Sequence, residues 1–130
     1  MGTQQHEVKI QNASMKRVGT RRDVLVMRQH VGKYHPVSSP KLVVNIGSPG
    51  MADSLMVVAV TITEEMLGKV VPVTVAAEFK TPTGRQSDAQ KNWQRAFEAR
   101  GGIYRLVRSP DEMEQLVTEV QSGELFRVAD

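Results

Sequence analysis

The stretch Val75–Pro82 constrains the fold of this chain more than any other, because an apolar run there ends in two charged residues. Read as a strand, it places Glu78 and Lys80 on the same face, since side chains along a strand alternate with period 2. Charges that leave water without a partner destabilise a buried strand. We therefore expect Glu78 and Lys80 to have a chemical task, and the one that fits best is to hold a divalent metal and activate water.

The composition is that of an ordinary globular domain. The chain has 130 residues, of which 40% are hydrophobic and 24% charged, enough for one core, so residues 1–130 are expected to form a single domain. The absence of cysteine excludes disulfides, thiolate metal sites and a cysteine nucleophile, so any metal must be held by oxygen or histidine. A net charge of +3 suits a polyanionic partner.

Membrane segments are not expected. Residues 1–11 are polar and lack the apolar core of a secretion signal, and no apolar run approaches the roughly 18 residues of a membrane helix. The sequence therefore predicts a cytoplasmic protein.

Hydrophobic periodicity and turn residues predict an α/β fold with a mixed β-sheet flanked by helices, whose main elements follow the order α-β-β-β-α-β-α. The strands expected over 54–62 and 70–80 should pair antiparallel. The helix that follows should return the chain to a strand parallel to 70–80, in a right-handed unit. The predicted helices cover 6–18, 88–100 and 110–121, the other strands cover 23–28, 41–46 and 103–107, and 35–41 forms a loop.

Two carboxylates and one cation could converge in such a fold. Asp53 directly precedes the strand over 54–62, and Glu78 and Lys80 lie at the end of the strand over 70–80. Two hard oxygen ligands and a lysine are the minimum set for metal-assisted hydrolysis of a phosphodiester. The carboxylates would hold Mg²⁺ or Mn²⁺, and the lysine would orient or deprotonate the water and stabilise the phosphorane.

Three segments strengthen this interpretation by resemblance to a known family. Gly47–Asp53, then Ala77–Lys80 with Gly84, Ser87 and Gln90, and finally Gly102–Ser109 resemble the virus-type replication-repair nuclease (VRR-NUC) domain. That domain is a branch of the PD-(D/E)xK nuclease superfamily, and the similarity runs from Glu7 to the last helix. It is closest to the small stand-alone type of phages and bacteria, and it implies a restriction-endonuclease-like sheet.

The resemblance also implies roles for individual residues. It makes Lys80 the catalytic lysine and places Gln90 near the site, with Glu7 contributing from the first helix. One departure is Ala52, which stands where the superfamily name has proline, and another is Arg28-Gln29-His30, where relatives often show an arginine followed by asparagines. The implied metal ligands are Asp53, Glu78, the backbone carbonyl of Phe79, and Glu7.

Each of these residues also has a structural interpretation that the sequence leaves open. Glu78 and Lys80 could form an exposed charge pair at a sheet edge, and Asp53 could cap a turn. Helix-terminal effects could account for Glu7 and Gln90, since acidic residues are favoured in a first helical turn and glutamine can cap a helix. Trp93 has the phase of a core residue, and the histidines, His6, His30 and His35, lack the spacing of a zinc site.

Basic residues gather in the first third of the chain and after the Glu78–Lys80 strand, whereas the last helix is mostly acidic. This asymmetry favours binding to a phosphate backbone, and the absence of a base-reading motif favours recognition of DNA structure. The expected DNA-binding residues are Arg28, Lys33, Arg85 and Lys91.

The function that combines these features is that of a metal-dependent DNA endonuclease acting on branched DNA. Small members of the family it resembles are similar to enzymes that resolve four-way (Holliday) junctions, and two cuts in a symmetric junction require a homodimer. Two alternatives stay open at this stage. One is a monomeric nuclease for flaps or nicked duplexes, and the other is a catalytically inactive DNA-binding protein on the same fold.

Overall fold

A computed structural model describes residues 2–129. It contains three α-helices, one short 3₁₀ helix and six strands within that range, an α/β composition as the sequence predicts. The chain divides into two compact units, each described here by itself. Unit 1 comprises residues 2–20 and 26–56, and unit 2 comprises residues 21–25 and 57–129.

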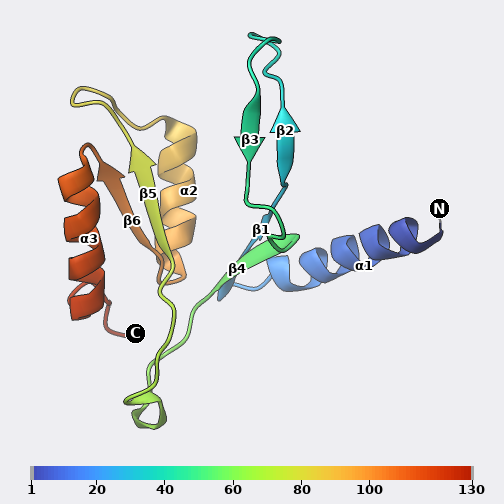
Figure 1. Cartoon of the computed structure of the whole chain (residues 1–130). Coiled ribbons are helices and arrows are strands. Elements are labelled where there is room, and N and C mark those ends of the chain that lie inside the picture. The colour runs from blue at the N-terminus through green and yellow to red at the C-terminus, as the bar shows by residue number, and fades with distance from the viewer. Residues whose placement is uncertain (1, 130) are drawn as a thin grey trace. The chain divides into compact units, whose positions relative to one another are not determined.

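Unit 2 is built on two parallel strands, β5 (Val75–Phe79) and β6 (Ile103–Val107). Their register runs from Val75 opposite Ile103 to Phe79 opposite Val107. The connection between them contains α2 (Asp88–Ala99), so strand, helix and parallel strand follow one another as the sequence predicts (Figure 1). The handedness of this crossover stays a prediction from the general rule.

Helix α2 covers one face of this strand pair. The Trp93 and Phe97 rings stack with their centroids 4.8 Å apart, and Trp93 lies 6.1 Å from the ring of Tyr104 in β6. Phe97 is 1% exposed. A Cβ on Gly102 would lie 2.4 Å from the Phe97 ring, so only glycine lets the chain pass behind that ring on its way into β6.

Helix α3 (Pro110–Ser122) covers the opposite face. It starts with Ser109 as N-cap and Pro110 in the first turn, a combination that favours helix initiation. Its Leu116 packs with Ile103 and Val107. These two strand residues alternate with Tyr104, which contacts α2, so the two helices lie on opposite sides of β5 and β6 (Figure 1).

Unit 1 contains α1 (Gly2–Gly19) and a hairpin of β2 (Gly32–Tyr34) and β3 (Val44–Ile46). The hairpin is antiparallel, with Lys33 opposite Asn45. The sequence predicts a strand over 41–46 but no partner for it, because the three residues of β2 are too few to show a period. Helix α1 is longer than the predicted span of 6–18 at both ends.

Strand pairing differs from the sequence prediction. In the described residues, β4 (Ser54–Val58) pairs with β1 (Val24–Arg28), and β5 pairs with β6, so the expected antiparallel pair of 54–62 and 70–80 is not formed. The result is three two-stranded sheets in place of one mixed sheet. The restriction-endonuclease-like arrangement of one sheet therefore stays a prediction.

Both predicted strands are also shorter in the structure. β4 ends at Val58, and a 3₁₀ helix, η1 (Glu64–Met66), lies between it and β5. β5 begins only at Val75, because Pro72 has no N–H to donate to a ladder. Across residues 2–129, no helix combines the length and the apolarity that a membrane span requires.

Candidate active site

Glu78 and Lys80 lie at the end of β5, with their side chains on the same face as strand alternation requires. The distance from Lys80 Nζ to Glu78 Oε1 is 3.4 Å, and the two side chains are 19% and 31% exposed respectively. The Lys80 N–H donates to the carbonyl of Val107 at 3.1 Å, which continues the β5–β6 ladder one residue past the strand. The pair is therefore held by the sheet and is partly shielded from solvent.

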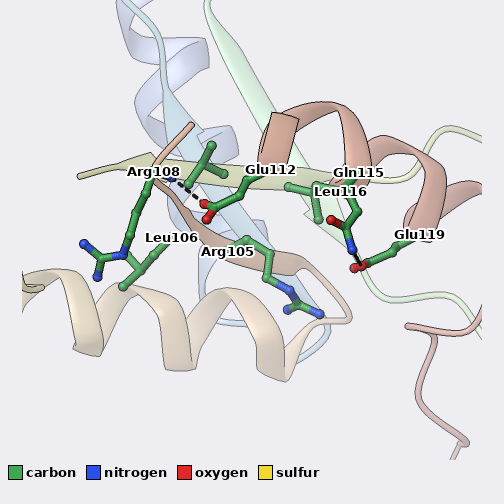
Figure 2. Close-up of a pocket in the computed structure, with 8 residues that line it drawn as sticks. Arg105, Leu106, Arg108, Glu112, Gln115, Leu116 and Glu119 are labelled. Carbon is green, nitrogen blue, oxygen red and sulfur yellow. Dashed lines mark hydrogen bonds between the residues drawn. The ribbon is translucent and has the colours of Figure 1, made fainter. Parts of the chain in front are cut away.

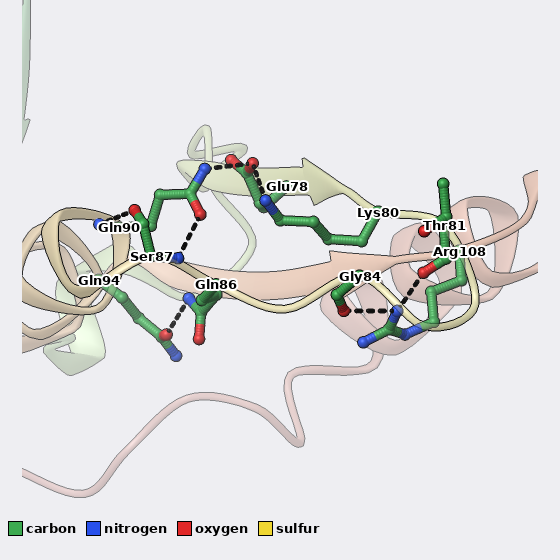
Figure 3. A network of polar contacts seen from close by, with 9 residues as sticks. All are labelled: Glu78, Lys80, Thr81, Gly84, Gln86, Ser87, Gln90, Gln94 and Arg108. Carbon is green, nitrogen blue, oxygen red and sulfur yellow. Dashed lines mark hydrogen bonds and ion pairs between the residues drawn. The ribbon is translucent and has the colours of Figure 1, made fainter.

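Gln90 fixes the position of the Glu78 carboxylate. Its Nε2 donates to Glu78 Oε1 at 2.7 Å (Figure 3). Its own Oε1 accepts from the N–H of Ser87 at 2.9 Å, while Ser87 Oγ accepts from the Gln90 N–H at 3.1 Å. This reciprocal capping box starts α2 and orients the Gln90 amide. Gln90 thus caps its helix, and the same side chain holds Glu78.

Two oxygens at this strand end remain available to a cation. Both described polar contacts of the Glu78 side chain involve Oε1, which leaves Oε2 open. The carbonyl of Thr74 accepts from the N–H of Ile103, and the N–H of Lys80 donates to the carbonyl of Val107. The backbone N–H and C=O groups of the even-numbered residues along β5 therefore point toward β6. Alternate residues of a strand bond to opposite sides. The Phe79 carbonyl therefore points to the open edge of β5.

Arg108 holds the loop that follows Lys80. Its Nη1 donates to the carbonyls of Thr81 and Gly84, the latter at 3.1 Å (Figure 3). The guanidinium thus ties both ends of the turn to the end of β6, directly after the lysine. Sequence reasoning gave Arg108 no role, because its partners are backbone atoms more than twenty residues away.

Asp53 lies in unit 1, exposed and directly before β4. Its carbonyl accepts from the N–H of Gln29 at 2.9 Å, so these two residues face each other beside the ends of β1 and β4. Residues that lie directly opposite share a face. Arg28 instead donates to Asn12 Oδ1 of α1 at 2.8 Å. Gln29, and not the expected DNA-binding residue Arg28, is therefore the residue opposite Asp53.

The structure brings together Glu78, Lys80 and Gln90, all of unit 2. Asp53 and Glu7 belong to unit 1, so the convergence of Asp53 with Glu78 stays a prediction. Within residues 2–129 as described, no three His, Cys, Asp or Glu side chains gather at one point. Glu7 is exposed and lies beyond the first turn of α1, so a helix-dipole preference does not explain it.

The other predicted residues lie on the surface of their own units. The side chains of Lys33, Arg85 and Lys91 are exposed, in β2, in the loop before α2 and in α2 respectively. The ring of His35 lies 3.1 Å from the carbonyl of Leu42, measured from Nδ1. Trp93 is 37% exposed at the edge of the α2 face, in the packing role that its helical phase predicts.

A shallow pocket lies between β6 and α3 (Figure 2). Glu78 instead contacts a side chain of α2, the helix that covers the other face of the strand pair. The acidic side chains of the pocket are already engaged, since Glu112 accepts from the N–H of Arg108 at 2.6 Å and Glu119 from Gln115 at 3.0 Å. Arginine and glutamate side chains both line it. Its charges therefore balance, and it favours neither a polyanion nor a metal.

Replacing Gln90 with methionine should separate capping from positioning when it is compared with Ser87→Ala. Both changes remove a cap contact and should lower the free energy of unfolding by about 1 kcal/mol. Only Gln90→Met releases Glu78, so for the nuclease activity that the resemblance implies we expect a loss of about tenfold in cleavage rate, because partners that orient a metal ligand are worth that much or more. Chemical denaturation and single-turnover cleavage measure the two effects. Equal cleavage rates for both variants would show that Gln90 acts only as a cap.

Comparison with known proteins returns no relative, because no family model, no curated protein and no solved structure matches this chain significantly. The resemblance to the VRR-NUC domain thus rests on the motifs quoted from the sequence, and the family assignment stays a prediction.

Proposed function

We propose that this protein is a metal-dependent DNA endonuclease. The observation that carries the proposal is the end of β5, where Lys80 and Gln90 hold one oxygen of Glu78. The other oxygen of that carboxylate and the open-edge carbonyl of Phe79 are left for a cation. A fixed carboxylate and a carbonyl oxygen at the end of one strand are ligands that a divalent cation prefers, and a lysine beside them can act on the water and the phosphate in metal-assisted phosphodiester hydrolysis.

The donor set suits Mg²⁺ or Mn²⁺, because both cations prefer carboxylate and carbonyl oxygens. Glu78 and the Phe79 carbonyl would hold the ion, with Asp53 as the second carboxylate and Glu7 as a further ligand. A bound divalent cation would supply Lewis-acid stabilisation of the phosphate and would lower the pKa of its water.

Lys80 then has two tasks that its position supports. Its ammonium lies 3.4 Å from Glu78 Oε1 and its side chain is only 19% exposed, so water screens its charge less than at a fully exposed site. From there the charged ammonium can orient the attacking water and can stabilise the negative charge that develops on the scissile phosphate, whereas the neutral amine would be the form that takes a proton from that water. Gln90 prevents the Glu78 carboxylate from turning toward solvent while this happens.

Branched DNA is the proposed substrate, and a homodimer is the proposed assembly. The basic residues Arg28, Lys33, Arg85 and Lys91 would bind phosphates, which positions DNA without reading its bases. A junction with two-fold symmetry has two equivalent strands to cut, and two copies of one site match them. A flap or nicked-duplex nuclease and an inactive DNA-binding protein are the alternatives.

Cleavage of labelled DNA tests these possibilities together. In Mg²⁺ or Mn²⁺ we expect the protein to cut a labelled four-way junction at two symmetric positions, with much slower cutting of the linear duplex and none in EDTA. Preferred cutting of a flap by a monomer in sedimentation would favour the second nuclease. Junction binding without cleavage in either metal would contradict the endonuclease proposal.

A further inference from the structure

The β2–β3 hairpin of unit 1 is an ordered ribbon with little of the chain packed on it. Its strands pair from Gly32 opposite Ile46 to Tyr34 opposite Val44, and they run side by side into the loop over 35–43 (Figure 1). The side chains of Tyr34 and Ile46 are nevertheless exposed, and Val37 at the tip is 98% exposed. Such a ribbon is shaped to contact something other than its own core.

Local contacts keep the ribbon ordered without a covering layer. At its base, Gly47 has a positive φ of 72°, and a Cβ there would lie 2.9 Å from the carbonyl of His30. At its tip, the N–H of Ser39 donates to Pro36 at 3.1 Å, and the N–H of Leu42 donates to Ser39 at 3.0 Å. The ribbon therefore holds its shape as a projecting element, with glycine required at the base.

The charge of the ribbon indicates the chemical class of its partner. No aspartate or glutamate occurs anywhere between Asp23 and Asp53, whereas the ribbon itself carries Lys33 and Lys41, both exposed. Prolines on either side of the tip restrict its backbone, and the residues between them are uncharged. A stretch with cations and no carboxylates complements a polyanion, and a two-stranded ribbon has the width to enter the major groove of duplex DNA.

We infer that residues 32–46 form a DNA-binding arm that grips a duplex through Lys33 and Lys41. The arm goes beyond single phosphate contacts, because it is a separate secondary-structure element and none of its residues belongs to the proposed metal site. It rests on the proposed action on DNA, but it makes its own prediction about binding in the absence of metal.

The test is DNA binding by the full chain in EDTA, with fluorescence anisotropy of a labelled duplex and a labelled four-way junction. The variant Lys33→Ala/Lys41→Ala should bind both DNAs about tenfold more weakly. Its plot of log affinity against log salt should be flatter by about two units, because each lost phosphate contact removes about one. The matched control is Lys9→Ala/Lys69→Ala, which removes the same charge from exposed positions outside the ribbon and should retain most of the affinity.

Equal losses of DNA affinity in the two double variants would overturn the proposal of a DNA-binding arm, since the lower net charge alone would then explain them. Unchanged DNA affinity together with altered sedimentation of Lys33→Ala/Lys41→Ala would also overturn it, because the ribbon would be a contact between protein copies. Cleavage by the wild type is scored separately. Loss of binding without any wild-type cleavage would support the arm and reject the nuclease, whereas cleavage with unaffected binding would reject the arm alone.

Discussion

Lys80→Ala should lower the rate of four-way junction cleavage in Mg²⁺ by about a thousandfold. Removing a positioned charge that stabilises a transition state costs about 10²–10³ in rate, and removing a general base costs about 10²–10⁴. Lys80 is placed for either task by its 3.4 Å approach to Glu78 and by the ladder hydrogen bond of its N–H. Single-turnover kinetics with saturating protein measure the chemical step without a contribution from binding.

The fold of this variant should be preserved, because the ladder bond to Val107 involves only the backbone of residue 80. Loss of the partly exposed ion pair should change the free energy of unfolding by about 1 kcal/mol or less. Lys69→Ala is the matched control, an exposed lysine in the loop after η1, and it should cleave at the wild-type rate. A cleavage rate of Lys80→Ala within tenfold of that of Lys69→Ala would show that Lys80 does not take part in the chemical step.

Glu78→Gln should weaken Mn²⁺ binding by about a hundredfold and abolish detectable cleavage. The amide keeps the shape of the carboxylate and still accepts a hydrogen bond from Gln90, so the packing at the end of β5 is retained. It removes the negative charge that a hard cation requires, and even indirect partners of a metal ligand are worth about 10–100-fold in affinity. Isothermal titration with MnCl₂ measures the affinity in the absence of DNA.

Glu65→Gln is the control for this change, because Glu65 is an exposed glutamate in η1 with the same charge. We expect its Mn²⁺ affinity and its cleavage rate to match those of the wild type. If Glu78→Gln binds Mn²⁺ as tightly as Glu65→Gln does, the metal site lies elsewhere and the proposed ligand set is wrong.

The sequence predicts unit 2 well because local signals determine most of it. Helices α2 and α3 begin at the predicted residues, each after a serine N-cap, and the strand that ends at Phe79 meets the strand over 103–107 in parallel. The capping role of Gln90 follows from its position three residues after a serine cap, whereas its contact with Glu78 depends on how α2 packs against β5. The proximity of Glu78 and Lys80 follows from strand alternation alone.

Unit 1 was predicted less well because its contacts are between distant residues with weak local signals. Strand β2 has three residues, too few to show alternation, and the pairing of β1 with β4 joins segments about thirty residues apart. The predicted pairing of 54–62 with 70–80 relied on adjacency in sequence, and Pro72 interrupts the second of these segments. That Gln29 lies opposite Asp53 could not be predicted either, because only the strand pairing shows it.

A crystal of the full chain soaked in MnCl₂ tests the metal site most directly, through the anomalous scattering of the bound ion. The proposal predicts a manganese peak at the end of β5 that is ligated by Glu78, the Phe79 carbonyl and Asp53, with Lys80 beside it. Peaks only at other positions, or a peak at Glu78 with Asp53 out of reach of the ion, would contradict the nuclease site proposed for this protein.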